Sequence, residues 1–74
     1  MTSAHWHLTF DGAQLAEPVL WELAHEHGLV TNIRRANVEE DLGWVLVEVR
    51  GEPAALAEGR AWLAAKGVRV AEID

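Results

Sequence analysis

The chain contains one sequence pattern twice. Each copy has an apolar segment that alternates with polar residues, then a glycine, a Glu-Pro pair followed by apolar residues at helical spacing, another glycine, and a second apolar segment. The Glu-Pro pairs are Glu17-Pro18 and Glu52-Pro53. A period of two is typical of a strand and a period of 3.6 is typical of a helix. The sequence therefore indicates an internal duplication of a strand–helix–strand unit.

Each predicted element has its own boundary signals. Pro18 and Pro53 suit the start of a helix, where the missing N–H costs nothing, and Gly28 suits a left-handed helix cap. Around 35–36 the alternation of the second strand slips, which predicts a β-bulge. In order, the predicted elements are a strand over 4–10, a helix from 18 to a cap at 28, a strand over 29–40 with a bulge near Arg35-Ala36, a tight turn over 41–43, a strand over 44–50, a helix from 53 to 66, and a strand over 68–73.

Two fused strand–helix–strand units have one compact solution, which is a four-stranded antiparallel sheet with both helices on one face. This is the ferredoxin-like βαββαβ fold of the α+β class, and we expect residues 1–74 to form one such domain. The first and third strands should lie in the centre of the sheet. Their residues facing the helices should be Trp6, Leu8, Phe10, Val45, Val47 and Val49.

The other face of the sheet has no helix left to cover it. Alternation places on it His5, His7, Thr9, Trp44, Leu46, Glu48 and Arg50, with Arg69, Ala71 and Ile73 from the last strand. We expect an interface at His5, His7, Trp44, Leu46 and Glu48, because a dimer would bury Trp44 and Leu46 and stabilise a short chain. The alternative is a solvated sheet face that carries one Trp, since much of any protein surface is apolar.

Composition limits the partners. The net charge is −6, and the chain has one Lys and five scattered Arg, which argues against nucleic acid and anionic membranes. No apolar run approaches the roughly 20 residues that span a bilayer, and the N-terminus has no signal-peptide pattern. We therefore expect a cytoplasmic protein without membrane insertion. With no Cys, disulfides cannot stabilise it.

The residues give little sign of catalysis. The chain has no Cys nucleophile, no Gly-x-Ser-x-Gly turn and no His-Glu-x-x-His helix, so we predict that it is not an enzyme and has no cofactor. His5 and His7 share a strand face with Glu48 and could form a zinc site, although this His spacing is common by chance and we predict no metal. RNA-binding domains of this fold stack bases on central-strand aromatics, but their Lys/Arg-Gly-aromatic signature is absent here.

The order of several short motifs resembles the NIL domain. These motifs are Leu8-Thr9-Phe10-Asp11-Gly12, Glu17-Pro18-Val19-Leu20, Gly28-Leu29-Val30-Thr31-Asn32-Ile33, Gly43, Val45-Leu46-Val47-Glu48-Val49-x-Gly51, and Trp62-Leu63 through Gly67-Val68-x-Val70. NIL domains are ferredoxin-like and related in shape to amino-acid-sensing ACT domains. They occur at the C-terminal end of the ATP-binding subunit of methionine-import ABC transporters, where they dimerise and bind methionine, and they also occur joined to iron–sulfur ferredoxin modules.

The resemblance implies a stand-alone regulatory domain that senses methionine or a related amino acid as a dimer. It places the candidate ligand site at Asn32, Ile33 and Arg34, where the family has Asn-Ile-Leu. The Asn32 amide can pair with an amino acid's carboxylate or amine, and Arg34 could hold a carboxylate. A purely structural role for Asn32 is the alternative. The alternative function is a protein-interaction module that docks on a transporter or ferredoxin-type partner without a small ligand.

Overall fold

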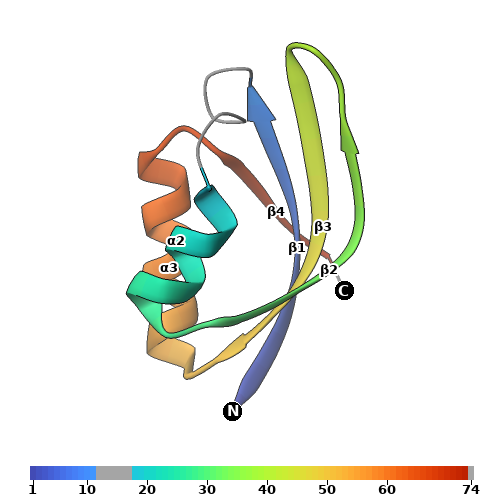
Figure 1. The fold of residues 1–74 in the computed structure, drawn as a ribbon. Helices are drawn as coiled ribbons and strands as arrows, with labels where there is room; N and C mark the ends of the chain where they lie inside the picture. The colour runs from blue at the N-terminus through green and yellow to red at the C-terminus, as the bar shows by residue number, and fades with distance from the viewer. Residues whose placement is uncertain (12–17, 74) are drawn as a thin grey trace.

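The computed structural model describes residues 1–11 and 18–73, and it has the predicted order of elements (Figure 1). Gly12 and Glu17, which the sequence analysis used as turn and helix signals, lie outside the described residues. The elements are β1 (Thr2–Asp11), α2 (Val19–His27), β2 (Val30–Val38), β3 (Leu42–Gly51), α3 (Pro53–Ala65) and β4 (Arg69–Ile73).

The four strands form one antiparallel sheet in the order β2-β3-β1-β4, and both helices pack on the same face (Figure 1). The prediction of a ferredoxin-like fold with β1 and β3 in the centre is therefore confirmed. Neither described helix has the length and apolar character that crossing a membrane requires.

The core lies between the central strands and the helices. Trp6 pairs with Val47 and Leu8 with Val45, so the buried residues of β1 stand opposite those of β3. Trp6, Leu8 and Val47 are at most 1% exposed. Burying each such side chain contributes about 1.5–3 kcal/mol, so this double row supplies much of the driving force for folding. All six residues predicted to face the helices are buried.

The helices complete this core as their apolar spacing predicts. On α2, Val19 and Leu23 are buried, and Gly28 ends the helix with a φ of 64°. On α3, Leu56, Gly59 and Leu63 are buried, and Gly67 follows with a φ of 87°. Both glycines adopt the left-handed conformation that side chains disfavour, which explains why each helix ends there.

The structure confirms one detail of the predicted strands and corrects another. The register of β2 against β3 shifts between Ile33 and Arg35, so the predicted bulge near Arg35-Ala36 is present and its extra residue is Arg34. The predicted turn at 41–43 was wrong, because Leu42 and Gly43 belong to β3. The turn lies earlier, where the Glu39 N–H donates a hydrogen bond of 2.8 Å to the Leu42 carbonyl.

Leu29 joins the helices to the sheet by filling a space that two glycines leave open. A Cβ added at Gly51 would lie 2.5 Å from Leu29 Cδ2, and one added at Gly59 would lie 2.9 Å from Leu29 Cδ1. Leu29 itself is only 4% exposed, so it has little room to move away. Gly51 is thus required by packing and not by backbone conformation.

We expect Gly51→Ala to lower the free energy of unfolding by about 1–3 kcal/mol, because the new methyl group overpacks the core around Leu29. The cost should vanish in a Leu29→Ala background, where the methyl enters the vacated space. Urea unfolding of the two single variants and the double variant measures this coupling. An equal cost of Gly51→Ala in both backgrounds would contradict the packing explanation.

Candidate functional site

The face of the sheet that no helix covers, which we call the open face, forms a grid of side chains set by the strand registers. One row crosses the strands as Asn32, Glu48, His5 and Ile73, the next as Arg35, Leu46, His7 and Ala71, and the third as Asn37, Trp44, Thr9 and Arg69. All ten residues that alternation placed on this face are on it. The open face therefore combines an apolar and aromatic centre with polar borders.

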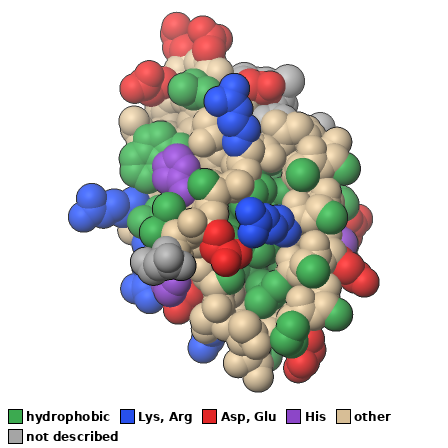
Figure 2. Space-filling view, turned by 180° about the vertical axis from the view of Figure 1, so that it is seen from behind, with side chains coloured by type: hydrophobic (Ala, Val, Ile, Leu, Met, Phe, Trp, Pro, Cys, Tyr) green, Lys and Arg blue, Asp and Glu red, His purple; other side chains and the backbone are tan. Residues whose placement is uncertain are grey.

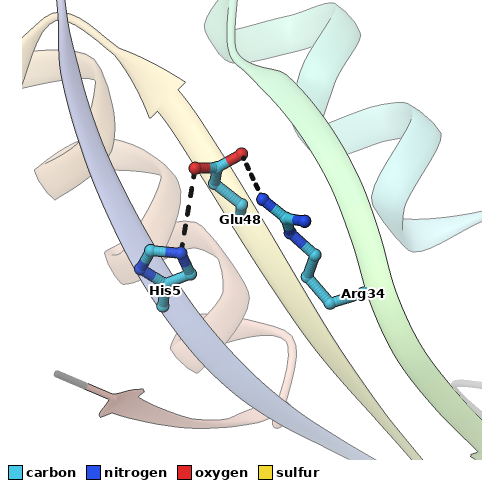
Figure 3. A network of polar contacts seen from close by, with 3 residues as sticks. All are labelled: His5, Arg34 and Glu48. Carbon is cyan, nitrogen blue, oxygen red and sulfur yellow. Dashed lines mark hydrogen bonds and ion pairs between the residues drawn. The ribbon is translucent and has the colours of Figure 1, made fainter.

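Glu48 is the most connected residue of this face (Figure 3). Its Oε1 accepts a hydrogen bond of 3.5 Å from Nη2 of Arg34, and its Oε2 lies 3.8 Å from Nε2 of His5. The Glu48 side chain is 20% exposed, whereas those of Arg34 and His5 are 54% and 45% exposed. A half-buried carboxylate thus lies between two more accessible nitrogen groups from neighbouring strands.

The bulge in β2 brings Arg34 to this position. Asn32 stands opposite Glu48, and the extra residue in the strand lets Arg34 reach the same carboxylate before Arg35 resumes the ladder opposite Leu46. In a regular strand, Arg34 and Arg35 would point to opposite faces of the sheet. Here both side chains lie on the open face, because the extra residue of a β-bulge changes the direction in which a side chain points.

Beside this cluster, His7 and Trp44 form a stacked pair with ring centroids 5.2 Å apart and an interplanar angle of 21°. Leu46 lies next to His7 across the strands, and both are half-buried. The stack gives the open face a flat apolar area with a polar rim, which suits recognition of a side chain from a ligand or partner.

The three residues predicted to bind a ligand do not lie together. Asn32 and Arg34 lie on the open face, next to Glu48. Ile33 stands opposite Val47 on the helix side, and it is 55% exposed because β2 is an edge strand. A ligand on the open face can therefore contact Asn32 and Arg34 but not the Ile33 side chain. The sequence analysis placed Glu48 in the predicted interface and missed its contact with Arg34, which depends on the exact position of the bulge.

The histidines do not form a metal cluster with Glu48. His5 contacts this carboxylate, whereas His7 stacks on Trp44. Within residues 1–11 and 18–73, no group of three His, Asp or Glu side chains has the arrangement to hold a metal ion.

One hollow on the helix side was not predicted from the sequence. It has a volume of about 360 Å³ and lies between α3 and the start of β1, with Trp6, Pro53 and Leu56 in its lining. Across it, Nη1 of Arg60 donates a hydrogen bond of 3.1 Å to Glu72. Trp6 is one of the lining residues, and its indole nitrogen is buried without a hydrogen-bond partner among the described residues. This hollow is the rival to the open face as a small-molecule site.

Together, the fold and the open face define a small α+β domain in which one face of the sheet is accessible to solvent. A family model, the NIL domain, matches residues 4–72. The chain therefore belongs to the NIL domain family, as its motifs suggested.

Among solved structures, the chain is similar to the crystal structure of the C-terminal domain of an ABC transporter ATP-binding protein from Enterococcus faecalis. The TM-score is 0.82 at 19% sequence identity, and the match covers 95% of this chain and 82% of that one. This likeness shows that the two share a fold. A search of curated proteins gave no match.

We expect Glu48→Gln to lower the free energy of unfolding by no more than about 1 kcal/mol, because its partners are accessible and such pairs contribute little. Arg60→Gln, which breaks the similar Arg60–Glu72 pair, is the matched control. Urea unfolding measures both. A loss of about 3 kcal/mol or more for Glu48→Gln alone would mark a buried structural ion pair and contradict an accessible site.

Proposed function

We propose that the chain is a regulatory domain that binds a free amino acid on its open face, with methionine as the first candidate from its family. The observation that carries this proposal is the position of Glu48 beside Arg34 and Asn32. An amino acid has an ammonium and a carboxylate on one carbon, and it needs groups of both charges close together. These three residues offer such a set at one point of the sheet.

Each residue has a distinct role in this proposal. Glu48 accepts hydrogen bonds from the ammonium, and Arg34 donates to the carboxylate, a pairing that guanidinium groups make well. Asn32 can donate or accept beside them. The Arg34–Glu48 contact of 3.5 Å is at the long limit for a hydrogen bond, so a ligand that separates the two groups gives up little.

The neighbouring apolar area suits the side chain of such a ligand. Leu46 and His7 lie in the row next to Glu48, and Trp44, which stacks on His7, lies one row further along the strands. A thioether packs favourably on apolar and aromatic groups, with a gain of about 0.3–1.5 kcal/mol for a sulfur–aromatic contact. This preference supports methionine over polar amino acids.

Binding without catalysis fits the character of this surface. Covalent chemistry needs a site that excludes water and supports its reacting groups, whereas the open face presents its polar residues to solvent. The crystal structure that shares this fold is a domain of a transporter ATP-binding protein. We propose that this chain acts in the cytoplasm in the regulation of a transporter.

We expect L-methionine at about 100 times its dissociation constant to stabilise the protein by about 2.7 kcal/mol, which raises the unfolding midpoint by roughly 10–20 °C. Thermal unfolding measures this shift. Methionine methyl ester, which lacks the carboxylate that Arg34 would bind, should lose most of it. N-acetylmethionine, which lacks the ammonium that Glu48 would bind, should also lose most of it.

The matching variants locate the site. Arg34→Gln and Glu48→Gln should each abolish the methionine shift, whereas Arg60→Gln, in the hollow beside α3, should leave it unchanged. Loss of the shift in Arg60→Gln alone would place the ligand in that hollow. Equal shifts with methionine, its ester and its acetyl derivative would contradict recognition by the Glu48–Arg34 pair.

The family resemblance also predicts a dimer, and the open face is where the sequence analysis placed its interface. Two copies that meet through this face would bury Trp44 and Leu46 but bring arginines together. We therefore expect the dimer fraction, measured by light scattering after size exclusion, to rise when NaCl increases from about 50 to 500 mM and screens the charges.

A matched pair of tryptophan variants tests where this dimer forms. Trp44→Ser should dissociate it, and Trp21→Ser, which changes an exposed Trp on α2, should not. Dissociation by Trp21→Ser alone would move the interface to the helix side, and a monomer at every salt concentration would contradict the dimer.

A further inference from the structure

Charge is divided unevenly between the two sides of the molecule. The open face carries four of the five arginines, Arg34, Arg35, Arg50 and Arg69, against the carboxylates of Glu48 and, at the end of β1, Asp11. The described acidic residues lie elsewhere, except for these two. Four of them, Glu22, Glu26, Glu52 and Glu58, lie on the helices and their flanks. Glu72 lies on the helix side of β4, and the β2–β3 turn carries Glu39, Glu40 and Asp41.

Figure 2 shows this division from behind. Lys and Arg side chains project from the sheet side of the molecule in this view, and acidic side chains gather at the end that carries the β2–β3 turn. A chain with a net charge of −6 thus has one surface on which basic groups prevail.

Three of these arginines surround the apolar centre from different sides. Arg35 lies on the β2 border beside Leu46, Arg69 lies on the β4 border beside Thr9, and Arg50 follows Glu48 toward the end of β3. All three are exposed, and in the part of the chain that the structure describes none forms an ion pair. Their charges are therefore available to a partner.

We propose that the open face docks an acidic segment of a partner protein, with an apolar side chain on the His7–Trp44–Leu46 centre and carboxylates on Arg35, Arg50 and Arg69. A central aromatic anchor with arginines around it is the arrangement in which protein interfaces concentrate binding energy. Arginine binds carboxylates in bidentate fashion, so the face is matched in charge and in geometry.

Other occupants fit this surface less well. The dimer proposed above would use the same face, but it would bring arginines against arginines, and like charges that meet in an interface are costly. An acidic segment and a second copy therefore compete for this face, and low salt favours the acidic segment. A long polyanion such as nucleic acid would extend past the patch onto a molecule that is acidic elsewhere. A short acidic segment meets only the basic area. The charge contacts of this proposal do not depend on amino-acid binding, because Arg35, Arg50 and Arg69 lie outside the Asn32–Arg34–Glu48 cluster. Both proposals place an apolar side chain on the His7–Trp44–Leu46 centre, so the two ligands would compete there.

The test uses a synthetic peptide of about ten residues, made of glutamates with two central leucines, and titration calorimetry on the full chain. Its affinity should fall when NaCl rises from about 50 to 500 mM, because charge pairs at the rim are screened. A peptide with glutamine at every glutamate position should bind much more weakly.

The chain offers a matched pair of double variants. Arg35→Gln/Arg69→Gln should raise the dissociation constant about tenfold. Arg60→Gln/Lys66→Gln, which removes the same charge from the helix side, should change it less than twofold. Circular dichroism checks that both variants stay folded, as expected for exposed positions.

Three results would overturn the proposal. They are no binding of the peptide at about millimolar concentration, equal effects of the two double variants, and tighter binding of single-stranded oligothymidylate than of the peptide. The last result would assign the face to nucleic acid. A loss of peptide binding in Arg35→Gln/Arg69→Gln with an intact methionine shift would support docking and leave the amino-acid site standing, so the two proposals fail separately.

Discussion

Ten residues of β1 pair antiparallel with ten residues of β3, and the rest of the structure depends on this pairing. Because side chains alternate between the two faces, the same two strands build both the apolar core and the open face. The two helices cover one of these faces, with Leu29 seated against Gly51 and Gly59. The open face is thus a direct consequence of a βαββαβ chain that has helices for only one face of its sheet.

A single irregularity gives the open face its chemistry. The bulge at Arg34 places two successive residues of β2, Arg34 and Arg35, on one side of the sheet. Arg34 joins Glu48 and His5 in a cluster of mixed charge, whereas Arg35 belongs to a ring of arginines that make no ion pair among the described residues. The open face therefore carries the two groups of residues on which our proposals rest, one suited to a zwitterion and one suited to carboxylates of a larger partner.

Period-two and period-3.6 patterns were enough to predict the elements, the sheet order and the buried face, because each followed from strong alternation such as that of Val45, Val47 and Val49. The exact position of the bulge was harder to predict from the sequence, since Arg34, Arg35 and Ala36 give no apolar signal that fixes the register. For that reason the sequence analysis missed the Arg34–Glu48 contact. It grouped Ile33 with Asn32 on the family motif alone, although alternation puts these two side chains on opposite faces of β2. Net charge was also a poor guide, because a sum of −6 hides an open face that is rich in arginine.

The central claim is that the NIL fold here presents an amino-acid site on its open face. A titration of ¹⁵N-labelled protein with L-methionine, followed by NMR, tests it most directly because the four tryptophans lie in the core, on the two helices and on the open face. The account predicts shifts of the Trp44 indole and of the backbone amides of Asn32, Arg34 and Glu48, while the indoles of Trp21 and Trp62 on the helices stay unchanged. Shifts centred on Arg60 and Glu72, or no shifts at millimolar ligand, would contradict it.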